Sequence, residues 1–278
     1  MQQPLSAAEQ FLADFHDRRP GITSAAYGTL EARRGELAFG SSYKSLAAEV
    51  SDADHRVLDL ACGDGFLLSL LQARAPLRLS LTGIDLSAGE LAAAQRRLKG
   101  AAHLCCCRAQ SLPMANAAFD HVVCHMALML MDDLESVLQE VRRVLGAGGK
   151  FSFVIGASPP SGQPALEAYI SGLRSLLSSE GSRPLRFGDA RLRSPDGIRQ
   201  ALTPWFTKLS IQELSLTRRY TPNQLWQWFE GMYDLAFFTP IQQAHFKSRY
   251  LAEIERLCDP DGRLGFTDTL RQVCAVAA

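Results

Sequence analysis

The stretch Arg56–Phe66 reads R-V-L-D-L-A-C-G-D-G-F and changes character halfway along. Its first half, V-L-D-L, is a short apolar run typical of a buried parallel strand. Its second half, A-C-G-D-G, consists mainly of small residues, and a helical pattern of apolar side chains begins at Phe66. A strand, a turn of small residues and a helix start present backbone N–H groups to a small molecule. The stretch therefore predicts a ligand-binding turn at the end of a strand.

An acidic residue, Asp59, lies on the predicted strand two residues before this turn. A carboxylate in that place suits a cationic amine better than a phosphate, because opposite charges attract and like charges repel. We therefore expect the ligand of the turn to carry an amine.

A second acidic residue ends the next predicted strand. Leu79–Asp85 reads L-S-L-T-G-I-D, and Asp85 follows Gly65 by twenty residues. At that spacing a carboxylate reaches the hydroxyl groups of a ribose held by the first turn. Alternatively, Asp85 caps the following helix, with Ser87 beside it. Position and spacing favour the ribose role.

Strand and helix patterns alternate over residues 56–156. This alternation predicts an α/β fold with a doubly wound, mainly parallel sheet and a ligand at the carboxyl edge of its strands. We expect one domain over residues 1–278, with an N-terminal helical cap at 1–55. Two helical insertions, 157–193 and 217–262, are expected beside the substrate. The aromatic stretch 226–238 of the second insertion could be a substrate lid or ordinary core. Trp226, Phe229 and Tyr233 recur there at helical spacing, which favours core packing.

The whole-chain composition limits the class of protein. Of 278 residues 47% are hydrophobic, and 29 basic residues balance 29 acidic ones. A nucleic-acid-binding protein usually shows a basic excess, and no apolar run here is long enough to span a bilayer. The consecutive Cys105–Cys107 does not have zinc-ligand spacing, so no metal site is predicted. We expect a cytoplasmic protein that acts on a small molecule and contacts neither nucleic acid nor membrane.

Four motifs in order resemble the class I, Rossmann-like S-adenosylmethionine-dependent methyltransferases of the small-molecule type. They are V-L-D-L-A-C-G-D-G at 57–65, G-I-D-L-S at 83–87, S-L-P-M followed by F-D-H-V-V within 111–123, and E-V-R-R-V-L-G-A-G-G-K at 140–150. The resemblance covers residues 56–156 and implies a seven-stranded sheet whose last strand is antiparallel. It also implies S-adenosylmethionine (SAM) as the cofactor.

The resemblance implies a role for each motif residue. Asp59 and the turn backbone, including Ala61, Gly63 and Gly65, would hold the methionine part of SAM. Asp85 would bind the ribose. The remaining expected contacts are Leu86 against adenine, the Ala109 N–H toward the adenine ring, and His125 beside the sulfonium.

Adenine recognition departs from the family pattern at Arg108. The family usually has an aspartate there that accepts from the adenine amino group, whereas a guanidinium has no acceptor. Either Gln110 supplies the acceptor, or backbone and water read the adenine edge. His125 could act as a general base, although a structural role is the commoner one at a strand end, so no catalytic residue is assigned.

The function implied is methyl transfer to a small, partly apolar metabolite, by O- or N-methylation. A nicotinamide-dependent oxidoreductase is disfavoured because Leu68 stands where its fingerprint needs a third glycine. Two alternatives stay open at this point: transfer of another SAM-derived group, and a non-catalytic SAM-binding partner protein.

Overall fold

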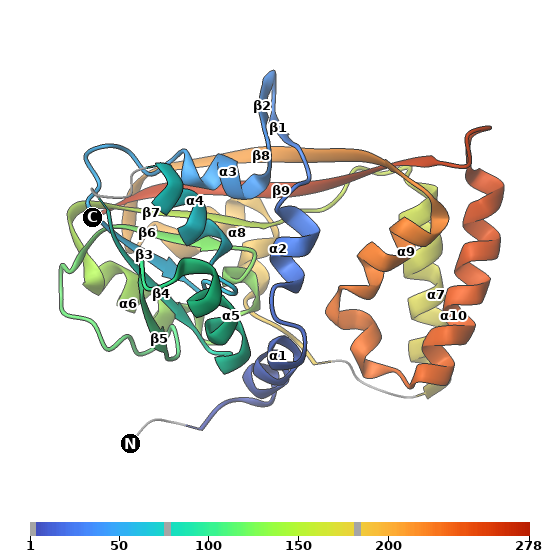
Figure 1. The fold of residues 1–278 in the computed structure, drawn as a ribbon, viewed down its shortest axis with the longest axis horizontal. Coiled ribbons are helices and arrows are strands. Elements are labelled where there is room, and N and C mark those ends of the chain that lie inside the picture. The colour runs from blue at the N-terminus through green and yellow to red at the C-terminus, as the bar shows by residue number, and fades with distance from the viewer. Residues whose placement is uncertain (1–3, 75–78, 181–184) are drawn as a thin grey trace. The chain divides into compact units, whose positions relative to one another are not determined.

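A computed structural model describes residues 4–74, 79–180 and 185–278 of the chain (Figure 1). It divides into two compact units. The first contains residues 1–158, 186–214 and 270–278, and the second contains 159–185 and 215–269. The single domain with substrate-side insertions stays a prediction, and residues 181–184 of its first insertion lie outside the described ranges.

One sheet holds the strands of the described residues, in the order β2-β1-β8-β9-β7-β6-β3-β4-β5. The strands β7, β6, β3, β4 and β5 are neighbours in this order, and each pairs with the next in the parallel direction. By contrast, β9 pairs with β7 in the antiparallel direction. The predicted α/β, mainly parallel fold is therefore confirmed. The strands are β1 (Ala32–Arg34), β2 (Leu37–Phe39), β3 (Arg56–Leu60), β4 (Ser80–Asp85), β5 (His103–Cys106), β6 (Phe119–His125), β7 (Leu145–Gly156), β8 (Phe206–Tyr220) and β9 (Leu264–Ala277).

The predicted strand number of seven is wrong, because the described residues form nine strands. The additional pair is the hairpin β1–β2, which joins the sheet next to β8. Its turn is possible because Gly35 adopts a positive φ of 57°. Three-residue strands containing Arg33 and Arg34 show no apolar alternation, which is why the helical interpretation of residues 1–55 missed them.

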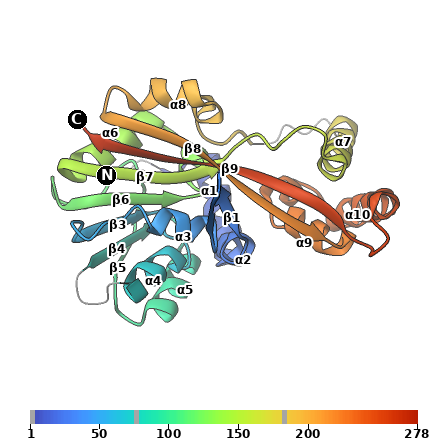
Figure 2. The ribbon, with the colours of Figure 1, turned by 90° about the horizontal axis from the view of Figure 1, so that it is seen from above.

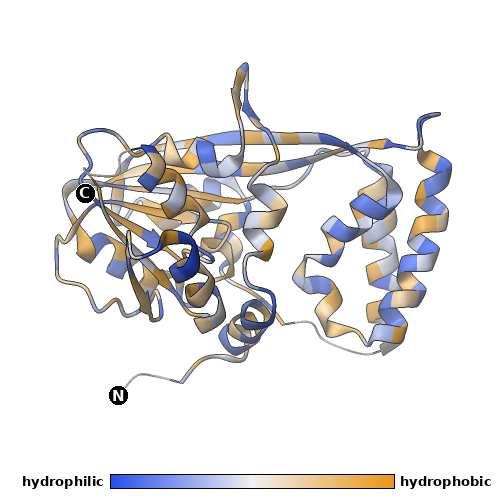
Figure 3. Ribbon diagram, in the orientation of Figure 1, coloured by the Kyte–Doolittle hydropathy of each residue, from blue (hydrophilic) through white to orange (hydrophobic). Residues whose placement is uncertain are grey.

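Helices cover both faces of the sheet in the first unit, with α6 and α8 on one side and α4 and α5 on the other (Figure 2). Leu58 and Leu60 of β3 join the apolar cluster that contains α6 and α8. Since side chains alternate along a strand, Val57 and Asp59 face the opposite side. In Figure 3 apolar colouring marks the strands that the helices of this unit cover. The helices of this unit are α1 (Ala7–Arg18), α2 (Ile22–Tyr27), α3 (Ser42–Ala47), α4 (Phe66–Arg74), α5 (Ala88–Leu98), α6 (Leu134–Val144) and α8 (Pro195–Leu202), with 3-10 turns at Leu128–Leu130 and Ala190–Arg193.

The second unit contains α7 (Pro164–Glu180), α9 (Pro222–Glu230) and α10 (Pro240–Ile254), with 3-10 turns at Tyr233–Phe237 and Glu255–Leu257. The helices α9 and α10 each begin with a proline preceded by a threonine capping box, which satisfies backbone N–H groups at the helix start. Trp226 and Phe229 are buried in the aromatic core of this unit, as their spacing predicted. The prediction fails for Tyr233, which is only partly buried, because α9 ends at Glu230 and Tyr233 begins a 3-10 turn. No helix in the described part of the chain is long and apolar enough to cross a membrane.

Candidate functional site

The turn between β3 and α4 has an unusual backbone. Ala61, Gly63 and Gly65 all have positive φ values, of 59°, 53° and 74°. A Cβ at Gly65 would lie 2.9 Å from Leu98 Cδ1, so this position has no room for a side chain. Ala61 has a side chain in the left-handed region, which costs about 1–2 kcal/mol.

The N–H groups of this turn are already engaged within the protein. Cys62 N donates to Ile84 O at 2.8 Å, and Gly65 N donates to Cys62 O at 3.0 Å. Gly63 N donates to the Asp85 carboxylate at 2.8 Å. The expectation of free N–H groups is therefore wrong at these three positions, because the left-handed turn folds its donors back onto β4 and onto itself.

Asp59 is a buried polar group of the site with one unsatisfied oxygen. Its side chain is 1% exposed, and its Oδ2 has no hydrogen-bond partner among the described residues. Burial raises the pKa of Asp59 well above its ordinary value, and the nearby carboxylates of Asp85 and Asp64 raise it further. A buried carboxyl group without a partner is costly. A cation is the ligand that removes this cost.

Asp85 is the last residue of β4, and its carboxylate also binds the backbone of the β3–α4 turn. One of its carboxylate oxygens accepts from Gly63 N, and the other accepts from Ser87 N at 2.8 Å. Burial raises the pKa of Asp85, against the lowering effect of the Ser87 and Gly63 N–H groups. The helix cap of α5 is Ser87, whose Oγ accepts from Glu90 N at 3.0 Å. Asp85 therefore does not cap α5, and its ribose role stays a prediction.

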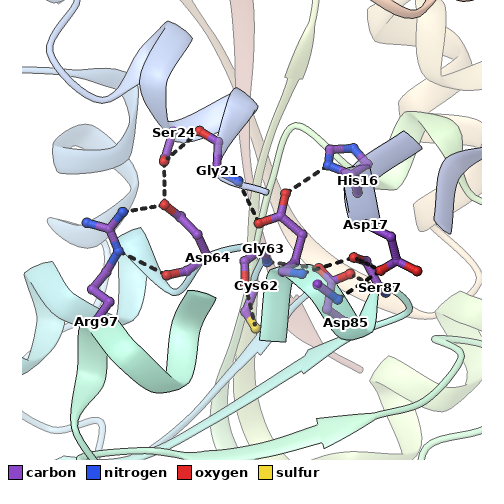
Figure 4. Close-up of polar contacts among 12 residues, drawn as sticks. His16, Asp17, Gly21, Ser24, Cys62, Gly63, Asp64, Asp85, Ser87 and Arg97 are labelled. Carbon is purple, nitrogen blue, oxygen red and sulfur yellow. Dashed lines mark hydrogen bonds and ion pairs between the residues drawn. The ribbon is translucent and has the colours of Figure 1, made fainter. Parts of the chain in front are cut away.

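The N-terminal segment makes polar contacts around this turn (Figure 4). Asp17 accepts from Ser87 Oγ at 2.6 Å and from Gly89 N at 2.8 Å. Glu90, which is 2% exposed, accepts from Gly21 N and contacts His16 Nδ1, both at 2.8 Å. The end of α1 and the loop that follows it are thus fixed to the N-terminal turn of α5.

Asp64 provides a second attachment for the N-terminal segment. Its carboxylate accepts from Ser24 Oγ at 2.7 Å and forms an ion pair with Arg97 of α5 (Figure 4). Sequence reasoning missed these contacts with Asp64 and Glu90. No local pattern could have indicated them, since the partners are 33 to 74 residues apart.

The loop after β5 holds the residues expected at adenine. Arg108 pairs with Glu9 of α1. Its Nη2 donates to both oxygens of the Glu9 carboxylate, at 2.7 and 2.8 Å. The amide nitrogen of Gln110 donates to Glu9 Oε1 at 3.1 Å and to Asp132 O at 2.7 Å. Ala109 between them is buried. A carboxylate is therefore present beside Arg108, although it comes from α1 rather than from the loop.

Leu86, expected to pack against adenine, is partly buried and directly follows Asp85. The end of β5 is tied to the same region, because Cys107 N donates to Asp85 O at 3.2 Å. The Cys106 thiol lies 3.6 Å from Leu86 O. The residues expected at the ribose and at the adenine thus belong to adjacent strand ends.

His125 ends β6 and is 6% exposed. Its Nε2 lies 2.9 Å from Ser42 Oγ, whereas Nδ1 has no hydrogen-bond partner among the described residues. Burial lowers the pKa of His125 to about 3, so the ring is neutral at physiological pH. The ring stacks on Tyr43 with centroids 3.5 Å apart. Ser42 and Tyr43, both on α3, fix its orientation.

Tyr43 connects the histidine with the acidic side of the site. Burial raises the pKa of the Tyr43 hydroxyl, and the carboxylates of Asp64 and Asp59 raise it further. The site therefore combines a buried carboxyl group with one unpaired oxygen, a neutral histidine and an aromatic wall at the carboxyl ends of β3, β4 and β6. This set fits a ligand that carries a positive charge, and it fits SAM through its ammonium and sulfonium groups.

Comparison with known proteins supports the same family. The Methyltransferase domain family matches residues 58–153. A demethylmenaquinone methyltransferase of Thermus thermophilus is 31% identical over 66% of this chain and 86% of its own length. A ubiquinone/menaquinone biosynthesis C-methyltransferase of Desulfotalea psychrophila is 37% identical over 38% of this chain and 43% of its own. This chain spans less than half the length of the first curated relatives it matches, with shares of 43%, 38% and 45%.

A solved structure shares the fold at low sequence identity. The geranyl diphosphate C-methyltransferase of Streptomyces coelicolor, solved with Mg2+, geranyl-S-thiolodiphosphate and S-adenosyl-L-homocysteine, is 13% identical. The alignment covers 100% of both chains with a TM-score of 0.57. The ordered motifs, the sheet topology and the Thermus relative agree, and the chain belongs to the class I S-adenosylmethionine-dependent methyltransferase family.

Proposed function

We propose that this protein binds SAM at the β3–α4 turn and transfers its methyl group to a small, partly apolar metabolite. The observation that carries the proposal is the Asp59 carboxyl group, which is buried, unpaired at Oδ2 and located where β3 reaches the turn. Its raised pKa expresses the cost of a charge without a partner, and an ammonium group would offset that cost.

The remaining cofactor contacts follow from the positions of the side chains. Asp85 would accept from the ribose hydroxyls with the lone pairs that Gly63 and Ser87 leave unused. Leu86 and Ala109 would contact the adenine ring, with the Gln110 amide oxygen as an acceptor at its edge. The backbone of Ala61–Gly65 would shape the methionine end.

When bound, SAM supplies an activated methyl group on a sulfonium. Because this methyl group is already electrophilic, the chain's own task is to orient an acceptor and to exclude water. His125 is neutral and has an open Nδ1, so it could take a proton from an acceptor hydroxyl or amine. Ser42 would act as a positioning residue that holds the ring through Nε2.

The acceptor is proposed to be a small molecule because the Thermus thermophilus relative is named for demethylmenaquinone and the Desulfotalea psychrophila relative for ubiquinone and menaquinone biosynthesis. The expectation of O- or N-methylation differs from the name of the Desulfotalea psychrophila relative, which is a C-methyltransferase. A screen of phenols, quinols and amines with SAM, in which S-adenosylhomocysteine and a product 14 mass units heavier are detected, identifies the atom. SAM consumption without a methylated product would favour transfer of another SAM-derived group. Binding of SAM without its consumption would favour a non-catalytic role. The cytoplasmic location stays a prediction.

Calorimetric titration of SAM into the wild type and into Asp59→Asn tests the proposal directly. Removing a charge-assisted contact worth about 1.5–3 kcal/mol should raise the dissociation constant about ten- to a hundredfold. Asp120→Asn is the matched control, since Asp120 on the neighbouring strand β6 pairs with Arg56 at the opposite end of β3. Equal SAM affinity in both variants would remove Asp59 from the cofactor site. Absence of SAM binding to the wild type would reject the proposal itself.

A further inference from the structure

The loop after β5 contains a glutamine whose side-chain amide has a fixed orientation. The amide nitrogen of Gln110 donates to Glu9 Oε1 at 3.1 Å and to the backbone oxygen of Asp132 at 2.7 Å. A carboxylate paired with an arginine and a backbone carbonyl can only accept, so the amide oxygen cannot take the place of the nitrogen. Both hydrogens of the nitrogen are used in these two bonds. The amide therefore presents only its oxygen to a ligand.

The amide oxygen of Gln110 is accessible. No described residue donates to it, and it is not one of the buried polar atoms that lack a partner. An atom that is neither paired nor buried is in contact with solvent. Gln110 and Leu86 are partly exposed, and Cys106 at the end of β5 is exposed. A molecule can therefore reach this oxygen without opening a packed core.

Glu9 of α1 holds the Gln110 nitrogen and has no capacity left for a ligand. Its Oε1 also accepts from Arg108 Nε at 3.0 Å and from Arg108 Nη2 at 2.7 Å. Its Oε2 accepts from Arg108 Nη2 and from Ser6 N, both at 2.8 Å. Because these bonds occupy the lone pairs of both oxygens, Glu9 acts on a ligand only through Gln110.

Arg108 makes this arrangement possible because it neutralises Glu9. The glutamate is only 6% exposed, and a buried carboxylate needs a charged or hydrogen-bonding partner. An aspartate at position 108, as in the family pattern, would instead bring a second negative charge to Glu9. The arginine at 108 and the glutamate at 9 are therefore a matched pair, and the acceptor on the accessible side is the neutral amide of Gln110.

We infer that Gln110 selects the base of the cofactor by its 6-amino group, and that Glu9 and Arg108 position the Gln110 amide for this selection. The inference rests on the proposed binding of SAM, which places adenine against Leu86 and Ala109. The adenine amino group donates to the open amide oxygen. A base with hydrogen at that position lacks this bond, and a base with a carbonyl there brings two acceptors together. The N-terminal helix thus contributes to base recognition through Gln110.

Two ligands that differ in one group test the selection. They are S-adenosylhomocysteine and its analogue in which hydrogen replaces the 6-amino group. In calorimetric titrations of the full chain, the wild type should bind S-adenosylhomocysteine about five- to tenfold more tightly, as expected for one hydrogen bond. Gln110→Met keeps the length of the side chain but removes the acceptor, so this variant should bind both ligands with equal affinity.

The variant Glu9→Gln tests the positioning role. A glutamine can still form the capping box with Ser6, so α1 begins in the same way. Its amide can turn either oxygen or nitrogen toward Gln110, which removes the fixed orientation of the Gln110 amide. The preference for S-adenosylhomocysteine over the analogue should therefore fall about threefold, with the affinity for the analogue unchanged.

Glu140→Gln is the matched control. Glu140 pairs with Arg143 and accepts from Leu112 N at 2.7 Å, so this variant removes a paired carboxylate beside the same loop. It should keep the wild-type preference between the two ligands, whatever its melting temperature.

The outcomes separate this inference from the proposed methyl transfer. Equal affinity of the wild type for both ligands would overturn the inference and leave SAM binding intact. Equal weakening of both ligands in Glu9→Gln would assign Glu9 a structural role only and would overturn its part in base selection. A wild type that binds no S-adenosylhomocysteine would reject the proposed function and this inference together.

Discussion

The two ends of β3 each carry a buried aspartate, and the two residues have opposite surroundings. Asp54, just before the strand, accepts from Ser51 N at 2.7 Å, from Lys150 Nζ at 3.0 Å and contacts His121 Nδ1 at 3.3 Å. Asp59, near the other end, has an oxygen without a partner. Burial raises the pKa of Asp54, but hydrogen bonds from His121, Ser51 and Lys150 outweigh it and hold the pKa below its ordinary value. The pKa of Asp59 is raised.

This contrast separates a structural acid from a ligand-binding one. A carboxylate surrounded by donors stabilises the folded chain, whereas one with an open buried oxygen costs free energy that a bound cation can offset. Both residues are buried and only five positions apart, so burial alone does not distinguish their roles. The partners do.

The largest effect is expected at the structural end. Asp54→Ala should lower the free energy of unfolding by about 3 kcal/mol, because His121 and Lys150 lose their common acceptor. Urea unfolding measures the loss, and SAM affinity per folded molecule should not change. A loss below 1 kcal/mol would show that the network contributes little and would weaken the contrast.

Asp85 should give an intermediate effect on both stability and affinity. Asp85→Ala leaves Gly63 N and Ser87 N without their acceptor, which should cost about 2 kcal/mol of stability and raise the SAM dissociation constant about tenfold or more. Asp85→Asn keeps one acceptor oxygen and should lose less of each. Melting curves and calorimetry measure the two quantities; a stability loss with unchanged affinity would leave Asp85 a backbone-binding role only.

Asp59→Asn should have the opposite sign from Asp54→Ala. Without ligand, the variant should be more stable than the wild type at neutral pH by about 1–2 kcal/mol, since the amide carries no charge into the core. Differential scanning calorimetry at pH 7 measures the difference. A less stable variant would mean that the Asp59 carboxylate has a stabilising partner.

The pH dependence follows from the direction of the pKa shift at Asp59. A raised pKa means that the folded state binds the proton more tightly, so this stability is lost as pH rises from the ordinary value of 3.8 through the folded pKa. Asp59→Asn removes this loss and should flatten the fall in stability at rising pH. The raised pKa of Asp85 contributes a further fall in the same direction, which the variant keeps. Asp54, with a lowered pKa, contributes stability above 3.8 that is lost as pH falls further.

The smallest effect is expected from the turn itself. Ala61→Gly relieves a left-handed alanine but makes the unfolded chain more flexible, so the net gain should be under about 1 kcal/mol. SAM affinity should stay within about twofold of the wild type. A clear loss of stability would show that the Ala61 methyl group packs usefully in the turn.

Much of the fold was predictable because it depends on local patterns. Apolar runs separated by helical spacing identified the alternation from Arg56 to Gly156, and small residues marked the turn. The hairpin Ala32–Phe39 was missed because its short strands contain charged residues. Two contacts depend on the tertiary fold: the ion pair of Glu9 with Arg108 and the contact of Ser42 with His125. Sequence spacing does not indicate either of them.

The antiparallel pairing of β9 with β7 has a consequence for synthesis of the protein. Gly156 pairs with Leu270, about 110 residues later in the chain. At about 5–20 residues per second, β7 waits about 6–23 s for this partner while the chain is made. During that interval an apolar strand edge is open to wrong pairing, which makes the nascent chain a candidate client of chaperones. Slowing translation between residues 156 and 270 should therefore increase aggregation without changing the finished protein.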